Sequence, residues 1–479
     1  MSGLYLAAAE AAPFTLDPTT VEALTGATWH GARHAVTIRG AVLDSRAARP
    51  GGLFVAIQGE RVDGHDFAAT AVGAGAVLVL AQRPLALPVP VLVAADPAAA
   101  LLALAAEFRR RFTGASWIAV GGANGKTTTK DLLAAACRGS GAPVHVTTGN
   151  LNNHLGVPLT ILATPAGTRY AIIEVGTNHP GEIAPLAAAV QPDVAVVTSI
   201  GPEHLEGFGD LAGVAREEAT LLAALPAGAP CFAGLHGLPG HAAAHGARVD
   251  DLVALLTAPA AGRALTLLDD GSHPTGHGDA PAGRVASLSI RLDTPAGSAE
   301  LPLPGAHNLS NATLAYHAAV AAGVTPVQAL AGLSRAVPSA GRCQPKAWGP
   351  HLIIDDTYNA NPASMIAGLA VLAGCPGERL AVLGRMGELG TSEAEGHRQV
   401  GAEAARLGLP LITVRAPEMA AGYRAAGGTD LVAAEDHLAA TTAVRARLVR
   451  RPVPTTILVK ASRSQALERV VNALLTAPC

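Results

Sequence analysis

The sequence predicts an α/β protein with parallel sheets, arranged in three domains. Short apolar runs recur along the chain, and each is followed by a turn signal and a helical pattern. Runs of this kind suit strands that are covered on both faces, and their alternation with helices implies βαβ units. The length of 479 residues fits about three domains. The runs are "WIAVGG", "YAIIEVG", "VAVVTSIG", "HLIIDD", "LAVLGR", "PLITV" and "TILVKAS".

Two breaks in this pattern divide the chain. One lies near "RRRFTGAS" and the other near "SRAVPSAGR", which predicts domains at residues 1–112, 113–340 and 341–479. We expect a smaller N-terminal α/β domain, a central domain built on a parallel sheet, and a C-terminal Rossmann-like domain. Residues 237–300 are rich in Gly, Pro, Asp and His with weak strand signals, so we expect a loop-rich part of the central domain there.

Composition limits the classes of function. The net charge is -3 and no long basic run occurs, which argues against a nucleic-acid or membrane-surface partner. The start of the chain lacks the basic region of a signal peptide, and no apolar run is long enough to span a bilayer. Dispersed cysteines without C-x-x-C spacing indicate reduced thiols. We therefore expect a soluble, cytoplasmic protein. The cysteines are Cys137, Cys231, Cys343, Cys375 and Cys479.

The stretch "AVGGANGKTTTK" predicts a phosphate-binding loop. It stands between a strand candidate and a segment with helical spacing at Leu132, Leu133, Ala136 and Cys137, the context that such a loop requires. Val120 replaces the first glycine of the strict P-loop pattern, which leaves the shorter form G-x-x-G-K-T. The alternative is a glycine turn that merely starts a helix. The predicted nucleotide-binding residues are Gly121, Gly122, Ala123, Asn124, Gly125, Lys126, Thr127 and Thr128.

This loop, in a P-loop-type central domain, resembles that of the Mur ligases, cytoplasmic enzymes that build the peptide of bacterial cell-wall precursors. Other segments extend the resemblance over nearly the whole chain and favour the branch that adds D-alanyl-D-alanine. The C-terminal domain lacks the D-N-P-R motif of the ligase that adds the third amino acid, which favours the same branch. These segments are "LDSRAARPGGLFVAIQGERVDGHDF", "TTGNLNNHLGVPLTIL", "YAIIEVGTNHPGEI", "HLEGFGDLAGVA", "LPGAHNLSNA", "IIDDTYNANPASM" and "ILVKASRSQALERVV".

The resemblance implies an ATP-dependent ligase that joins D-alanyl-D-alanine to UDP-N-acetylmuramoyl-tripeptide in peptidoglycan precursor synthesis. In that reaction the γ-phosphoryl group turns a carboxylate into an acyl phosphate, which the amine then attacks. Catalysis of this kind consists mostly of positioning and charge neutralisation. The implied cofactors are ATP and Mg²⁺, and the implied partners are the two substrates. We expect a monomer, without nucleic acid and without membrane insertion.

The resemblance also assigns roles around the nucleotide. Lys126 is expected to neutralise the β- and γ-phosphates, Thr127 and Glu174 to hold a first Mg²⁺, and His204 to belong to a second Mg²⁺ site. Asn308 is expected to touch the adenine. From the C-terminal domain, Arg342 and Asp356 are expected to reach the nucleotide.

Substrate contacts follow from the same resemblance. Structural alternatives remain open, because Arg46 could be a surface cation, and Asn150 and Asn153 could only shape a turn. Glu174 could likewise be a solvated strand-end carboxylate, and His204 an ordinary loop histidine. The implied contacts are Ser45 and Arg46 to the uridine diphosphate, Asn150, Asn152 and Asn153 toward the muramoyl group, and Tyr358, Asn359 and Asn361 in the loop beside the nucleotide.

The chain departs from the family at Glu218, where a lysine that forms a carbamate with CO₂ is customary. The helix pattern of "DLAGVAREEATLLAAL" places Glu218 in the middle of an apolar stripe and Glu217 at its edge. A carboxylate on a buried face needs a cation or hydrogen-bond donors. A carbamate also ends in a carboxylate-like anion. We therefore expect Glu218 to contribute to the Mg²⁺ site.

A second departure is Arg385 in "LGRMGELG", where an aspartate is customary, and a third is Ala461, where a glycine is customary. Arg385 reverses a charge on the side where the amine is expected to bind. The roles of Lys460, Ser462 and Arg463 stay open, and helix capping would explain Ser462 equally well. Two alternatives remain: a Mur-type amide ligase with another amine or acceptor, and a non-catalytic ATP-binding paralogue.

Overall fold

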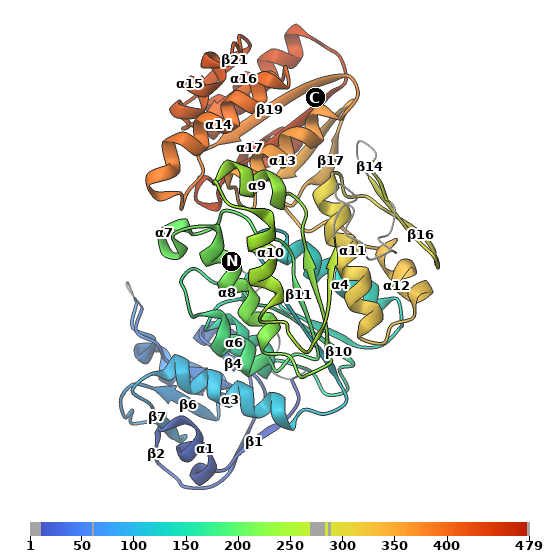
Figure 1. Ribbon diagram of the computed structural model, residues 1–479. Coiled ribbons are helices and arrows are strands. Elements are labelled where there is room, and N and C mark those ends of the chain that lie inside the picture. Colours follow the sequence, from blue (N-terminus) through green and yellow to red (C-terminus); the bar gives the residue numbers. More distant parts are fainter. Residues whose placement is uncertain (1–10, 60–61, 269–282, 286–288, 477–479) are drawn as a thin grey trace.

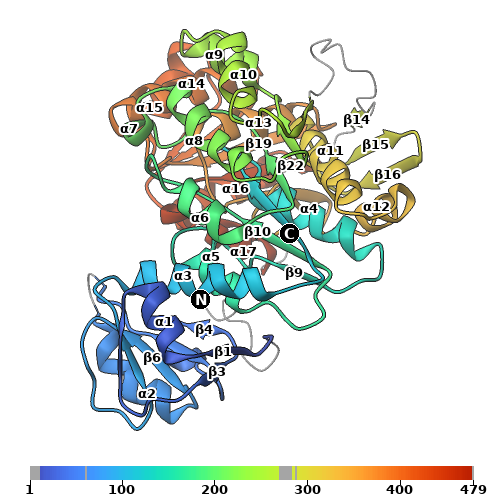
Figure 2. The ribbon, with the colours of Figure 1, turned by 60° about the horizontal axis from the view of Figure 1, so that its bottom comes forward.

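The computed structural model describes residues 11–59, 62–268, 283–285 and 289–476, with elements grouped into three α/β parts. Figure 1 shows the N-terminal part in blue at the bottom and the C-terminal part in orange and red at the top, with the central part between them. Figure 2 shows the same arrangement after rotation. The α/β class with parallel sheets is confirmed. The described residues form two six-stranded sheets, a five-stranded sheet, and smaller sheets of three and two strands.

The N-terminal part is a five-stranded sheet in the order β2-β7-β6-β5-β4, in which β2 alone runs antiparallel to its neighbour. A two-stranded antiparallel pair, β1 and β3, lies beside it. The elements are β1 (Phe14–Leu16), α1 (Pro18–Thr25), β2 (Thr28–His30), β3 (Val36–Ile38), β4 (Ala41–Val42), η1 (Ser45–Ala47), β5 (Leu53–Val55), η2 (Gly64–Phe67), α2 (Ala68–Gly73), β6 (Leu78–Ala81), β7 (Val91–Val93) and α3 (Pro97–Arg111).

The central part is built on a parallel sheet in the order β13-β12-β11-β8-β10-β9, so β8 lies in its middle. The elements are β8 (Ser116–Gly121), α4 (Lys126–Arg138), β9 (Val144–Val146), α5 (Gly156–Leu162), β10 (Tyr170–Glu174), α6 (Ile183–Val190), β11 (Val194–Val197), α7 (Leu205–Phe208), α8 (Leu211–Ala223), β12 (Pro230–Gly234), α9 (Leu238–Ala244), α10 (Val249–Thr257), β13 (Ala264–Leu268), β14 (Gly283–Val285), β15 (Ile290–Thr294), β16 (Gly297–Leu301), α11 (Ala306–Ala321) and α12 (Pro326–Leu333).

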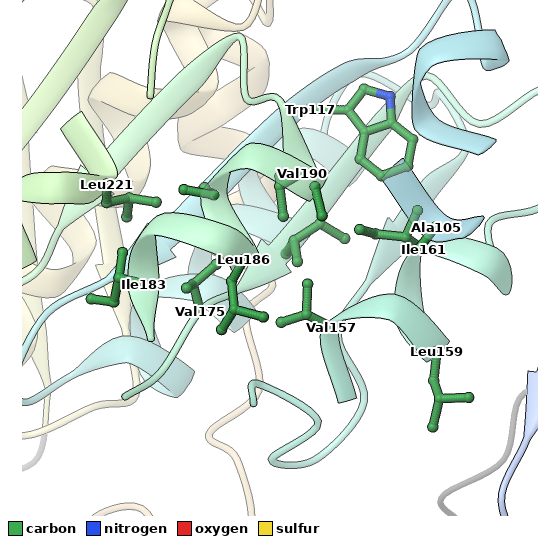
Figure 3. Packing of buried hydrophobic residues seen from close by; sticks show 14 of the residues in the cluster. Ala105, Trp117, Val157, Leu159, Ile161, Val175, Ile183, Leu186, Val190 and Leu221 are labelled. Atoms are coloured by element: carbon green, nitrogen blue, oxygen red, sulfur yellow. The ribbon is translucent and has the colours of Figure 1, made fainter. Parts of the chain in front are cut away.

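Both faces of the central sheet are buried, which explains why β8 has no polar alternation. Successive side chains of a strand point to opposite faces. Trp117 and Ala119 pack on one side, in a core shared with α3, α5, α6 and α8 (Figure 3). Ile118 and Val120 pack on the other side, in a core shared with α4, α11 and α12. Close packing on both faces of the sheet therefore holds the strands in place, and with them the loops at the carboxyl ends of β8, β10 and β11.

The C-terminal part is a six-stranded sheet in the order β17-β18-β22-β19-β20-β21, parallel except for β17. Apolar cores cover both of its faces. The elements are β17 (Gln344–Trp348), β18 (His351–Asp356), α13 (Pro362–Ala373), β19 (Glu378–Gly384), η3 (Gly390–Ser392), α14 (Glu393–Arg406), β20 (Leu411–Val414), α15 (Pro417–Ala425), β21 (Leu431–Ala434), α16 (His437–Arg450), β22 (Thr455–Lys460), η4 (Arg463–Gln465) and α17 (Glu468–Leu475).

The expectation of a loop-rich segment at residues 237–300 is wrong for much of the described part of it. Two helices and strands β13 to β16 lie there. In β15 the inward residues Ile290 and Leu292 alternate with exposed or half-buried ones, a pattern of only five residues that the surrounding turn-forming residues obscure. Residues 269–282 and 286–288 lie outside the described residues.

Two other expectations concern the cysteines and the membrane. Cys137, Cys231, Cys343 and Cys375 are buried free thiols, whereas Cys479 and the first ten residues, on which the signal-peptide expectation rests, lie outside the described residues. Within the described ranges, no helix has both the length and the apolar character needed to cross a membrane.

The backbones of α4 and α12 approach closely at two glycines. A Cβ atom on Gly332 would lie 2.2 Å from the carbonyl oxygen of Ala135, and one on Gly139 would lie 2.0 Å from that of Gln328. Only glycine allows such an approach, because a carbon this close to a backbone oxygen forces the helices apart.

We therefore expect Gly332→Ala to lower the thermal unfolding temperature, at a cost of about 1–3 kcal/mol. Gly240→Ala is the matched control, because Gly240 also lies in a helix but a Cβ there meets nothing within 4 Å. It should be neutral or stabilise by up to about 1 kcal/mol through higher helix propensity. Equal melting temperatures for the two variants would contradict the close approach.

Candidate functional site

The predicted phosphate loop lies at the carboxyl end of the middle strand. Strand β8 ends at Gly121 and helix α4 begins at Lys126, so the strand–turn–helix context is confirmed. Gly122 (φ 114°) and Gly125 (φ 87°) have left-handed backbones that favour glycine. A Cβ on Gly122 would also lie 2.2 Å from the hydroxyl oxygen of Thr198. Both glycines are therefore required by the turn itself.

The end of β11 holds this loop through Asn124. The hydroxyl groups of Thr198 and Ser199 donate to the carbonyl oxygen of Asn124 at 2.6 and 3.1 Å. The N–H of Asn124 donates back to the Ser199 hydroxyl at 3.0 Å. The loop is thus fixed on the neighbouring strand, and the first turn of α4 presents the backbone N–H groups that bind phosphate oxygens in such loops.

Lys126, the first residue of α4, is half-buried, and 15% of its side chain is exposed. Its ammonium group donates to the carbonyl oxygens of Gly122 and Ala123 and pairs with Glu203 at 3.3 Å. Burial alone would lower the pKa of Lys126, but the carboxylates of Glu203, Glu218 and Glu174 together raise it. The lysine is therefore charged. A triphosphate bound at this loop would lie beside a cation that three carboxylates of the protein already approach.

Glu174, the last residue of β10, forms hydrogen bonds with two other predicted site residues. Its Oε1 atom accepts hydrogen bonds from the Thr127 hydroxyl at 3.2 Å and from the Asn152 amide at 2.8 Å. Its Oε2 atom is buried, lies 3.9 Å from the ammonium of Lys130, and accepts no hydrogen bond from a described residue. Glu174 is 1% exposed, so the alternative of a solvated strand-end carboxylate is wrong.

Glu218 is fully buried on α8 and faces the loop. Its Oε2 atom accepts the N–H of Gly122 at 2.6 Å, which is the hydrogen-bond donor that its buried position requires. Burial, with the nearby charge of Glu203, raises the pKa of Glu218 well above its usual range. Glu217, expected at the edge of the stripe, is also buried. Both of its oxygens accept backbone N–H groups, from Gly181 and Ile183 at 2.8 Å each, which compensates for its burial.

The chemistry of these carboxylates fits Mg²⁺. Glu174, Glu203 and Glu218 each have one buried oxygen that accepts no hydrogen bond from the described residues, and hard oxygen ligands are what Mg²⁺ prefers. The described part of the chain holds no group of three or more acidic, histidine or cysteine side chains already converged on one cation position. His204 adjoins Glu203 and has a left-handed backbone (φ 42°) at the start of α7.

The C-terminal part contributes side chains directly to the loop. Arg342 donates to the Thr127 hydroxyl at 3.3 Å, and its guanidinium lies 4.1 Å from the centre of the Tyr358 ring. The amide of Asn361 donates to Asn124 at 2.8 Å. The structure thus brings two of the predicted C-terminal residues, Arg342 and Asn361, to the phosphate loop and the start of α4, with Tyr358 against Arg342.

Other predicted residues make contacts within their own part. Asp356 pairs with Lys460 at 2.7 Å and accepts the N–H of Cys343, and the Asn359 side chain accepts the N–H of Ala360. Asn308 is buried, donates to the carbonyl oxygen of Pro304, and accepts from Asn311. Contacts of these residues with the nucleotide or substrates stay predictions.

The residues predicted to bind the UDP-sugar lie in the N-terminal part and in the loop before α5. Arg46 donates three hydrogen bonds to Asp44, and its side chain is 87% exposed. Ser45 is buried beside it, whereas Asn150 is exposed. Asn153 accepts the N–H groups of Leu155 and Gly156, so it shapes the start of α5, as the turn-forming alternative expects.

Sequence reasoning missed three residues of this site. Glu203 pairs with Lys126, Lys130 approaches Glu174, and the amide oxygen of Asn311 lies 2.5 Å from where a Cβ on Gly125 would be. Lys130 could have been found, because it follows Lys126 by four residues on one helix face. The position of Asn311 depends on how α11 packs on α4, which no local pattern contains.

Arg385 and Ser462 make contacts within the C-terminal part, whereas nothing in the structure explains Ala461. The Arg385 guanidinium pairs with Glu393 at 2.6 Å, so much of its charge is balanced within the C-terminal part. Ser462 precedes η4 but caps no helix N–H; its hydroxyl donates to the carbonyl of Arg385 and accepts the N–H of Gly387. The capping explanation for Ser462 is therefore wrong.

The site consists of a glycine loop at the end of the middle strand of a parallel sheet, a half-buried lysine, and side chains of a second α/β part against the loop. This is the arrangement of a nucleotide-binding enzyme. Three domain descriptions match this chain: the Mur ligase family catalytic domain over residues 37–109, the Mur ligase middle domain over 120–238, and the Mur ligase glutamate ligase domain over 341–463. The chain belongs to the Mur ligase family.

Individual relatives agree with this assignment. The UDP-N-acetylmuramoyl-tripeptide--D-alanyl-D-alanine ligase of Escherichia coli strain K12 is 37% identical, over 92% of this chain and 94% of its own. Among solved structures, MurF from Acinetobacter baumannii superposes with a TM-score of 0.83 at 30% identity, covering 98% of this chain and 100% of its own. MurF ligase from Thermotoga maritima in complex with ADP gives a TM-score of 0.73 at 25% identity, over 91% and 97% of the two chains.

The adjacent residues Glu217 and Glu218 allow a matched test of the site's electrostatics. Glu218→Gln keeps an acceptor for the Gly122 N–H and replaces a buried carboxyl that is costly to ionise beside Glu203, so the melting temperature should stay the same or rise. Glu217→Gln replaces one of two used acceptors by an amide donor and should destabilise by about 1–3 kcal/mol. Thermal unfolding without ligands measures both. If Glu218→Gln lowers the melting temperature as much as Glu217→Gln does, this description of Glu218 is incorrect.

Proposed function

We propose that this protein joins D-alanyl-D-alanine to UDP-N-acetylmuramoyl-tripeptide at the expense of ATP, in peptidoglycan synthesis. The observation that carries the proposal is Lys126 directly after a glycine loop, within a chain that matches D-alanyl-D-alanine ligases over nine-tenths of its length. The proposed domains are residues 1–112 for the UDP-sugar, 113–340 for ATP, and 341–479 for closing on ATP and binding the amine. We further propose a cytoplasmic monomer.

In the proposed mechanism, the chain acts by holding charges in place. Lys126 neutralises the outer phosphates, and the N–H groups at the start of α4 bind their oxygens. Arg342, stacked on Tyr358, reaches the same end of α4 from the C-terminal part and adds a second cation. A carboxylate of the UDP-linked substrate then accepts the phosphoryl group, and the amine of the dipeptide displaces phosphate.

Glu174, Thr127 and Glu218 are the residues that we propose to hold Mg²⁺, with His204 near a second Mg²⁺. Bound there, Mg²⁺ would neutralise phosphate charge during phosphoryl transfer. Lys126 donates to the carbonyl oxygens of the loop, so its ammonium leaves these acceptors when it binds phosphate. An α-amino group is partly neutral near pH 7, with a pKa of about 8, so a dedicated base is not required.

The decisive experiment measures ADP formation with each substrate omitted in turn. We expect ADP only when ATP, Mg²⁺, UDP-N-acetylmuramoyl-tripeptide and D-alanyl-D-alanine are all present. Lys126→Met should lower turnover about 100-fold or more, because the cation proposed to neutralise the phosphates is lost. ADP formation with another amine or acceptor in place of these substrates would favour a different Mur-type ligase. ATP binding without ADP formation would favour a non-catalytic paralogue.

The contribution of Glu218 to the Mg²⁺ site has its own test. Glu218→Gln should raise the Mg²⁺ concentration needed for half-maximal turnover, since an amide is a weaker ligand for a hard cation than a carboxylate. Because the same variant is expected to fold normally, the effect separates metal binding from stability. If the variant turns over at low Mg²⁺ as fast as the unchanged protein does, Glu218 does not contribute to Mg²⁺ binding.

A further inference from the structure

Asn361 makes two different contacts with the two ends of its amide. Its Oδ1 atom accepts the N–H of Ser364 at 2.8 Å, as the N-cap of α13, and the Ser364 hydroxyl accepts the backbone N–H of Asn361 at 3.0 Å. Its Nδ2 group donates to Oδ1 of Asn124 at 2.8 Å. One side chain thus links the beginning of a helix in the C-terminal part to the phosphate loop in the central part.

Asn124 is the loop residue whose position decides the shape of the turn. It lies between Gly122 and Gly125, both with left-handed backbones. Its backbone is held from β11 by Thr198 and Ser199. Its side chain, in contrast, is held by Asn361 of the C-terminal part. The two glycines give the turn conformational freedom, and the hydrogen bonds to Asn124 restrict that freedom.

We propose that Asn361 is a positioning residue that keeps the phosphate loop in its nucleotide-binding shape when the C-terminal part lies against it. The inference rests on the proposed use of ATP. Asn361 acts through Asn124. Arg342 reaches the same end of α4 by a separate bond to Thr127, so the loop receives two independent contacts from the C-terminal part. Of these, the one through Asn361 restrains the loop itself.

The test uses a substitution that preserves the cap. Serine is as good an N-cap residue as asparagine, so Asn361→Ser keeps α13 capped but is too short to reach Asn124. We expect kcat/KM for ATP to fall about three- to tenfold, as for the loss of one hydrogen bond. The KM for the UDP-linked substrate and the melting temperature should stay unchanged. A lower melting temperature with equal losses for both substrates would mean a merely structural role and would overturn the proposal.

Asp436→Ser is the matched control. Asp436 caps α16 in the same C-terminal part by accepting the N–H of Ala439 at 2.8 Å, so the change again exchanges one good cap for another. We expect unchanged turnover. A cycle of Asn124→Ala, Asn361→Ser and the double variant isolates the pair. The double variant should lose no more than the larger single loss, whereas multiplied losses would show that the two residues act separately.

A readout without turnover separates this proposal from the proposed function. Amide hydrogen exchange of residues 122–125, measured without any substrate, should be faster in Asn361→Ser than in the unchanged protein. If the unchanged protein never forms ADP, the proposed function fails while the exchange result still decides the role of Asn361. Equal exchange rates in the two proteins would overturn the positioning role, whatever the activity.

Discussion

The ion pairing of the half-buried Lys126 ammonium with nearby carboxylates is the interaction on which the rest of the site depends. Three carboxylates approach the ammonium from different segments of the central part: Glu203, Glu218 and Glu174. Each would be costly to take out of water without a cation nearby. The lysine offsets part of that cost, although burial still keeps the pKa of Glu218 raised. The ends of β10 and β11 and the face of α8 can therefore converge under one glycine loop. The same convergence leaves one buried oxygen of each carboxylate without a hydrogen bond from the described residues, and such oxygens suit the Mg²⁺ site proposed above.

The sequence was sufficient for features that depend on local pattern. The strand at residues 116–121, the helix face of Leu132 and Leu133, and the buried position of Glu218 all follow from apolar spacing and were confirmed. Features that depend on packing between distant segments were not predictable in the same way. Glu203 contacts Lys126 only because β11 lies beside β8. In residues 237–300 the strands are short and stand among turn-forming residues, so their pattern is weak.

The role of a residue that departs from or matches a family motif also depends on the side chains that contact it. Arg385 looked like a reversed charge in the amine region, but Glu393 lies against it, so the pair rather than the residue determines the local field. Asn361 looked like a substrate contact, yet both ends of its amide are bonded to the protein. A residue identified by its place in a motif can therefore act through another residue.

The apolar interior is distributed unevenly among the three parts. Phe14 and Leu101 of the N-terminal part belong to one continuous cluster with Trp117 and Leu186 of the central part, whereas the clusters of the C-terminal part are made of its own residues. Separating the first two parts would expose much of this shared interior to water, so they form a joint folding unit. The apolar clusters of the C-terminal part include no described residue of the other two parts, so it can swing as a rigid body without dividing a shared core.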